Sequence, residues 1–110
     1  MQRFGMFGKV VVQKGKRDEM MRLLFESARV VGMLPGCCLY VVNVSPTEPD
    51  AIWVYEAWRT QADHDESLQL DNVKAIIAQA RPLMASFESS RFVPVGGHGL
   101  NNNDAQRSGL

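Results

Sequence analysis

The apolar residues of this chain change their spacing several times, and the order of those changes limits the folds open to it. A β-branched and aromatic run over residues 4–12 is typical of a strand, and it stops at the polar and glycine residues 13–15. Over residues 16–32 the apolar positions recur at helical spacing, with charged residues on the other face. The chain is therefore expected to begin with a strand and a helix of about four turns.

The middle of the chain is typical of two strands joined by a short loop. Residues 37–44 follow a Leu-Pro-Gly turn at residues 34–36, and they end at residues 45–50, whose two prolines oppose regular structure. A loop of this length favours a hairpin with the next apolar run, residues 51–59. That third strand is the most aromatic part of the protein, and it holds Trp53, Tyr55 and Trp58.

Two helices are expected in the last part of the chain. Thr60 and Asp63 resemble a capping box, which makes Thr60 the expected N-cap of a short helix over residues 60–70. Asp71 is expected to cap a second helix. The apolar stripe of that helix extends over residues 73–84.

Pro82 should kink this second helix or bring it towards its end, because proline removes a backbone donor. Residues 91–95 predict a fourth, short strand, and a glycine-rich segment comes after it. Residues 1–100 are expected to form the domain, and residues 101–110 to form a disordered, dispensable tail.

The predicted order of strand, helix, strand, strand, helix and strand is that of a split βαβ unit. In this arrangement four antiparallel strands carry the helices on one face, which gives an α+β, ferredoxin-like βαββαβ fold. A chain of 110 residues leaves no room for a second substantial core. We therefore expect one domain.

The third predicted strand is apolar on both of its faces. Because side chains alternate along a strand, the two sets are Ile52, Val54 and Trp58 on one face, and Trp53, Tyr55 and Ala57 on the other. One set can meet the helices, and the other would form an exposed patch of the kind that marks an interface. A second copy of the same sheet is the simplest cover, since two-fold dimers are the commonest homo-oligomers. A homodimer is expected.

Charge and hydropathy narrow the classes of partner. Twelve basic residues balance twelve acidic ones. The chain therefore lacks the net positive charge that attracts nucleic acids or anionic membranes. No apolar stretch approaches the roughly 20 residues of a membrane span, and the first residues do not form a signal peptide, so a cytoplasmic location is expected. Adjacent cysteines, Cys37 and Cys38, would point to opposite faces of a strand, and no disulfide is expected between them.

Several segments resemble the antibiotic biosynthesis monooxygenase family, in particular its quinol monooxygenase type. The resemblance rests on Val-Tyr-Glu-Ala-Trp-Arg at residues 54–59, His-Asp-Glu-Ser-Leu at residues 64–68 and Val-Lys-Ala-Ile-Ile at residues 73–77. Residues 32–37 match the Pro-Gly-Cys turn that often opens the second strand of that family, and residues 94–100 resemble the ending of many bacterial members. Together these segments cover most of residues 6–100.

The resemblance implies a dimeric α/β barrel with a pocket between each sheet and its helices. Characterised members oxidise electron-rich aromatics such as quinols or anthrones with O2, without metal or flavin, and relatives with this fold degrade haem. A Trp, a His and an Asn carry the function in several of them. Trp58 matches the strand-end Trp, His64 the helix His, and Glu56 the acidic neighbour. Asn43 is the only Asn in a predicted strand, and it does not align with the catalytic Asn of the family.

Each candidate residue also has a structural interpretation. His64 lies among carboxylates and could transfer a proton near pH 7, or it could be a solvated histidine. Trp58 could stack on a flat substrate or fill the core. Glu56 shares its strand face, so it would line the same pocket and would need a partner or a raised pKa. Tyr40 and Tyr55 could donate to a bound carbonyl, or they could be core or interface residues.

No cofactor motif is visible, and the two histidines, His64 and His98, are too far apart in the chain to suggest a metal site. The first hypothesis, which the resemblance implies, is a cofactor-independent monooxygenase, with His64 as base or anion stabiliser, Trp58 as stacking wall and Glu56 polarising the site. Tyr40, Asn43 and Tyr55 are the candidate substrate-binding residues. The alternatives are a non-catalytic module that binds a small aromatic molecule and, third, a haem-degrading enzyme.

Overall fold

Strands and helices follow one another in the predicted order in the computed structural model, which describes residues 2–100. The elements are β1 (Phe4–Val12), α1 (Arg17–Val31), β2 (Cys37–Val44), β3 (Ala51–Trp58), α2 (Gln61–Ser67), α3 (Asp71–Ala80), a 3-10 turn η1 (Arg81–Leu83) and β4 (Met84–Phe92). The predicted tail, residues 101–110, lies outside the described residues. No helix in the described part of the chain is long and apolar enough to cross a membrane.

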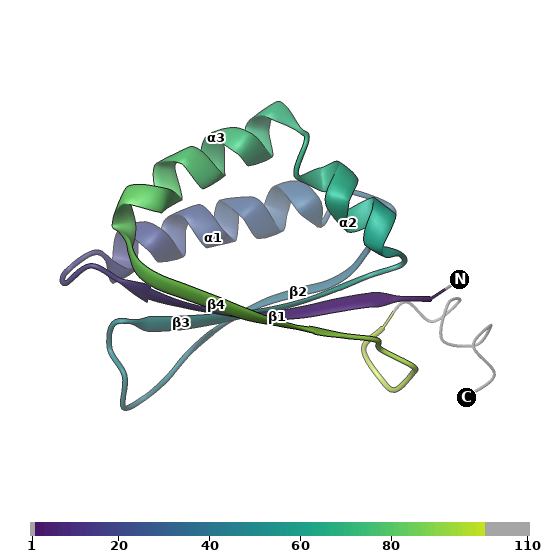
Figure 1. The fold of residues 1–110 in the computed structure, drawn as a ribbon, viewed down its shortest axis with the longest axis horizontal. Coiled ribbons are helices and arrows are strands. Elements are labelled where there is room, and N and C mark those ends of the chain that lie inside the picture. Colours follow the sequence, from purple (N-terminus) through teal and green to yellow (C-terminus); the bar gives the residue numbers. More distant parts are fainter. Residues whose placement is uncertain (1, 101–110) are drawn as a thin grey trace.

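The four strands form one antiparallel sheet in the order β2-β3-β1-β4. All three α-helices lie over the same face of this sheet (Figure 1). The predicted α+β, ferredoxin-like class is confirmed. Because β3 lies inside the sheet, its residue Glu56 is paired with Met6 of β1 on one side and with Tyr40 of β2 on the other. Directly paired residues share a face of the sheet, so all three side chains point towards the helices.

Pro82 brings the second long helix to its end, which is one of its two predicted effects, but the helical stripe predicted up to residue 84 and the predicted fourth strand are wrong. Helix α3 ends at Ala80, Pro82 lies in the 3-10 turn, and the chain is already extended at Met84. The fourth strand is therefore Met84–Phe92 rather than residues 91–95. It is an exposed edge strand with mostly polar side chains, so it carries little of the apolar alternation that identifies a strand.

Of the N-caps predicted for α2 and α3, the first is confirmed and the second is wrong. Thr60 is confirmed as the N-cap of α2, where its hydroxyl accepts a hydrogen bond from the backbone N–H of Asp63. The cap predicted at Asp71 is wrong. Leu70 occupies the N-cap position of α3 without a side-chain bond, and Asp71 is the first helical residue. Its carboxylate lies in the first turn, where it interacts favourably with the positive end of the helix dipole.

The core lies between the sheet and the helices in two clusters of buried side chains. The larger cluster includes Met20 and Leu23 of α1 and Ile52 of β3, which are almost completely buried. The smaller cluster gathers Phe4, Val31, Trp58 and Val73 at the end of the sheet near α2. Burial of these side chains supplies the main driving force for folding.

The opposite face of the sheet carries no helix in the described structure (Figure 1). Phe7 of β1 and Tyr55 of β3 are paired there, with ring centroids 6.0 Å apart. Val41 is paired with Tyr55 from the other side, and Lys9 lies 5.1 Å over the ring of Trp53. The face expected to carry Trp53 and Tyr55 is thus the one that the helices leave uncovered.

Candidate active site

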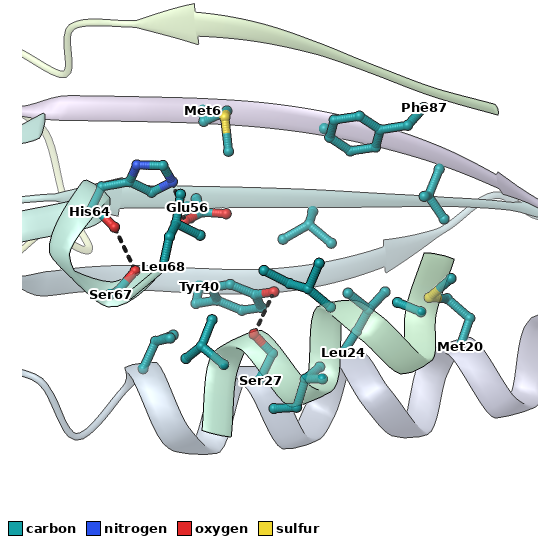
Figure 2. Close-up of a pocket in the computed structure, with 18 of the residues that line it drawn as sticks. Met6, Met20, Leu24, Ser27, Tyr40, Glu56, His64, Ser67, Leu68 and Phe87 are labelled. Carbon is teal, nitrogen blue, oxygen red and sulfur yellow. Dashed lines mark hydrogen bonds and ion pairs between the residues drawn. The ribbon is translucent and has the colours of Figure 1, made fainter. Parts of the chain in front are cut away.

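A cavity of about 190 Å³ lies between the sheet and the three helices (Figure 2). Its wall is mostly aliphatic and aromatic, with contributions from all four strands and every α-helix of the described residues. Apart from the indole N–H of Trp58, its polar side chains are Ser27, Tyr40, Glu56, His64 and Ser67. The structure therefore brings four of the six predicted site residues, Tyr40, Glu56, Trp58 and His64, to one cavity.

Glu56 places a carboxyl group in this apolar wall. Its side chain is largely buried, and the indole Nε1 of Trp58 donates a hydrogen bond to its Oε1 over 2.8 Å. Burial raises the pKa of Glu56, while the Trp58 hydrogen bond and nearby His64 partly oppose that rise. A carboxylate with a raised pKa is a stronger base than an ordinary one, which suits proton abstraction inside a cavity.

His64 approaches Glu56 from α2, with its Nε2 3.7 Å from Oε1 of Glu56. Its Nδ1 lies 3.0 Å from Oδ1 of Asp65, whose side chain is exposed. When Nδ1–H donates to Asp65, the lone pair of Nε2 faces the Glu56 carboxyl. The three groups form a chain from the buried carboxyl through the imidazole to solvent. Such a chain can carry a proton out of the cavity.

The position of α2 depends on two local features. The Thr60 cap fixes where the helix begins, and the turn before β2 packs tightly against it. A Cβ atom at Gly36 would lie 2.6 Å from the Asp63 side chain, so this contact requires glycine. The imidazole of His64 is then held by Phe4, at a centroid distance of 4.8 Å, and by the edge-on ring of Trp58, at 5.8 Å. His64 is only 7% exposed as a result.

Tyr40 adds a neutral donor to the cavity wall. Its hydroxyl donates to Oγ of Ser27 over 3.2 Å, and both groups are drawn in Figure 2. Burial raises the pKa of Tyr40 to about 12. The phenol therefore keeps its proton at neutral pH and can donate a hydrogen bond to an anion.

Trp58 is more deeply buried than a stacking wall requires. It is 1% exposed and packs with Phe4, Val31 and Val73. Its contact with the site is the N–H that it donates to Glu56. The geometry supports a positioning role for Trp58, and it does not present an open ring face to a ligand.

Phe87 of β4 supplies the exposed aromatic ring of the cavity and was missed by the sequence analysis. It is 57% exposed and lies across Gly8 of β1, where an added Cβ would be 3.2 Å from the ring. Because Gly8 has no side chain, the Phe87 ring can pack directly over it. Phe87 could be found only after β4 had been assigned, because it lies in an otherwise polar segment.

Asn43 and Tyr55 do not reach this cavity. Nδ2 of Asn43 donates to the backbone oxygens of Val41 and Trp53 over 3.3 and 3.2 Å. Tyr55 packs against Phe7 on the open face. The alternation of a strand already places residue 55 opposite residues 56 and 58. A substrate-binding role for these two residues gains no support from their positions.

Cys37 is not placed for nucleophilic chemistry. Neither Cys37 nor Cys38 forms a disulfide, as expected from their adjacent positions. Burial, together with the charge of Glu56, raises the pKa of the Cys37 thiol to about 11. No group of three His, Cys, Asp or Glu side chains within residues 2–100 is arranged to hold a metal ion.

The fold and the site together define a small ferredoxin-like protein with an apolar cavity and a buried carboxyl–imidazole pair. The family model of the antibiotic biosynthesis monooxygenases matches residues 4–79. The chain belongs to this family.

Solved structures agree with that assignment. A protein of Chloroflexus aurantiacus J-10-fl, provisionally named an antibiotic biosynthesis monooxygenase, is 42% identical, with a TM-score of 0.83 over 90% of this chain and 99% of its own. A similarly named protein of Caulobacter crescentus CB15 is 25% identical, with a TM-score of 0.78 over 86% of this chain and 91% of its own. A search of curated proteins gives no significant match.

Proposed function

We propose that this protein is a monooxygenase that oxidises a one-ring or two-ring quinol with O2. The observation that carries the proposal is the Glu56–His64 pair in the wall of a mostly apolar cavity. Family membership supplies the reaction class. The pair supplies a base where the substrate would bind.

The size of the cavity favours small substrates. An apolar cavity of about 150 Å³ holds a benzene ring, and this one measures about 190 Å³. A quinol with one ring fits this space, and one with two rings can extend towards the mouth beside Phe87. A three-ring anthrone is a poor fit, and a tetrapyrrole is a worse one, which ranks haem degradation last.

The first step is removal of a phenolic proton. The hydroxyl of the quinol donates its proton to the Glu56–His64 pair, whose carboxyl is made more basic by burial. Asp65 stabilises the charge that forms on the imidazole, since its carboxylate lies 3.0 Å from Nδ1. The neutral phenol of Tyr40 can donate to the resulting phenolate once its hydroxyl has turned away from Ser27. The carboxyl of Glu56 and the imidazole of His64 are held in place before the substrate arrives, so the proton transfer needs little reorganisation of the pair.

The second step uses the electrons of the substrate itself. The phenolate reduces O2, a C–O bond replaces one ring C–H bond, and the O–O bond breaks. One quinol and one O2 give one hydroxyquinone and one water. Oxidation of the ring carbon and of both hydroxyl groups supplies all the electrons that O2 needs. The aliphatic wall keeps water away from the anion, which makes the anion a better electron donor.

A second copy of the chain is part of the proposal. The open face of the sheet carries Phe7, Trp53, Tyr55 and Val41, and pairing two such faces would bury them. The cavity lies on the other face of the sheet. Each protomer would therefore hold its own site in a homodimer.

A module that binds a small aromatic molecule without turnover is the second candidate. One observation favours it: Asn43, the only Asn in the strands of the described residues, lies on the face away from the cavity. Among the described residues the site then depends on a carboxyl and an imidazole without a carboxamide. Binding would still use the aliphatic wall and Phe87.

Oxygen consumption distinguishes the two candidates. Protein freed of metal and flavin is mixed with one-ring and two-ring quinols and with a three-ring anthrone, and O2 uptake is compared with the spontaneous rate. We expect uptake with the smaller quinols, incorporation of one atom of labelled oxygen per product, and little activity with the anthrone. The variant Gln79→Ala, changed on the exposed side of α3 and outside the cavity, should keep full activity. Binding of quinols without any uptake above the spontaneous rate would establish the binding module instead.

A further inference from the structure

We infer a second ligand site, which holds a small oxyanion such as a carboxylate or phosphate group between Arg3 and Arg91. It is a separate cavity of about 230 Å³ at the start of β1 and the end of β4. Its described lining consists of Gln2, Arg3, Phe4, Gln61, Arg91, Phe92 and Val93. This inference does not depend on the proposed function.

Arg3 is a buried cation without a partner among the described residues. It is only 7% exposed, and its Nε and Nη2 are buried with no hydrogen-bond acceptor in the part of the chain described. A guanidinium group does not lose its proton in proteins, so the cost of burial cannot be avoided by neutralisation. Buried charges are normally paired, because an unpaired one is strongly destabilising. An acceptor that occupies the cavity would remove this cost.

Arg91 brings a second positive charge to the same cavity. Its guanidinium carbon lies 5.8 Å over the ring of Phe4, and this contact holds the side chain at the wall of the cavity. The described lining includes two amides, from Gln2 and Gln61, and no Asp or Glu. Two cations, two amide donors and no acidic group are a combination that attracts an anion. The planar fork of arginine matches two oxygens of a carboxylate or phosphate.

Phe4 separates this site from the first cavity. Phe4 lines this site, His64 lines the first cavity, and no residue lines both. The ring of Phe4 packs against His64 at a centroid distance of 4.8 Å. An anion beside Arg3 would therefore lie behind the aromatic wall of the first cavity, outside the place where a quinol would bind.

Thermal unfolding with inorganic phosphate tests the inference on the full-length protein. Acetate and phosphate are added in separate arms at matched ionic strength, with chloride as reference, and protein concentration is held constant. The variant Arg3→Met keeps the length of the side chain and removes its charge. Arg22→Met removes the same charge from an exposed position on α1 and is the matched control.

We expect phosphate or acetate to raise the Tm of the wild type and of Arg22→Met by roughly 4 °C or more near saturation. Arg3→Met should lose this rise, and in chloride alone its Tm should equal or exceed that of the wild type, because an unpaired charge has been removed. The arm with the larger rise identifies the preferred oxyanion. Equal shifts in all three proteins would overturn the inference. So would a lower Tm of Arg3→Met in chloride together with a smaller mass by light scattering, because Arg3 would then pair with a second copy of the chain.

Discussion

The indole Nε1 of Trp58 donates a hydrogen bond of 2.8 Å to the carboxylate of Glu56, and the two residues are separated by one position on β3. Both side chains lie on the helix face of the sheet because a strand alternates its faces. The bond fixes the carboxylate in an apolar wall and favours its charged form against the cost of burial. Trp58 thus acts on the site through Glu56.

Replacing Trp58 by Phe should shift the pH dependence of turnover. The variant loses the N–H that lowers the pKa of Glu56, so this pKa should rise further above its ordinary value. The rising limb of kcat/KM against pH should then move to higher pH. A Phe ring retains much of the buried area, so KM should change less than kcat at neutral pH. An unaltered pH profile in a folded variant would show that the hydrogen bond does not tune Glu56.

Glu56→Gln should change how stability depends on pH. The pKa of Glu56 is higher in the folded protein than in the unfolded chain, so its favourable contribution is complete below the ordinary pKa of glutamate. That contribution is lost as pH rises through the raised pKa. The Tm of wild type minus that of Glu56→Gln should therefore fall with rising pH over this range. Glu88→Gln, on the exposed strand β4, serves as control, and a difference as constant as that of the control would contradict the raised pKa.

Local patterns predicted most of the fold. The apolar alternation of β1 and β3 and the helical spacing of α1 were strong enough to place these elements within one or two residues. Edge strand β4 was misplaced because its exposed positions are polar, and because the apolar Leu83 and Met84 continue the stripe of α3. The end of that helix was predicted from Pro82 rather than from periodicity, because proline removes a backbone donor.

The site was predictable to the extent that it depends on strand parity. Glu56 and Trp58 share a face by alternation, and the family resemblance added His64. The roles of Asp65 and Phe87 depend on where α2 and β4 lie in three dimensions, which spacing does not fix. The guanidinium of Arg3, whose Nε and Nη2 have no hydrogen-bond partner among residues 2–100, could not be predicted either, since burial of a charged residue before the first strand has no sequence signal.

A negative charge on the open face of the sheet should dissociate the proposed homodimer. Phe7→Asp places a carboxylate beside Tyr55, where a second sheet would otherwise pack. Phe25→Asp makes the same change at an exposed position on α1 and is the matched control. Gel filtration with light scattering at micromolar concentration should give a dimer for the wild type and the control, and a smaller mass for Phe7→Asp. A monomeric wild type would contradict the proposal.

The thiol of Cys37 should react slowly with alkylating reagents. Its pKa is raised to about 11, so near pH 8 its thiolate fraction should be about 100-fold below that of an ordinary cysteine. The variant Cys38→Ser leaves Cys37 as the only thiol, and its rate of alkylation can be compared with that of a small free thiol. Alkylation at the rate of the free thiol would mean that Cys37 is not held in the partly buried position described.

The path of the proton from the cavity to solvent can be tested by substitution. His64→Ala should lower kcat by roughly 10²-fold or more if the imidazole takes part in proton transfer. Asp65→Asn keeps the imidazole but removes the charge that stabilises its protonated form, so it should give a smaller loss of kcat at nearly unchanged KM. Glu66→Gln removes the neighbouring exposed carboxylate and is the matched control.

The three variants separate a relay from a simple base. If His64 relays the proton between Glu56 and Asp65, both His64→Ala and Asp65→Asn should slow turnover and Glu66→Gln should not. Full turnover in His64→Ala would leave Glu56 as the base, exchanging its proton directly with the substrate in the desolvated cavity. A loss in Asp65→Asn no larger than in Glu66→Gln would mean that the 3.0 Å contact between Asp65 and His64 orients the ring without carrying charge to the surface.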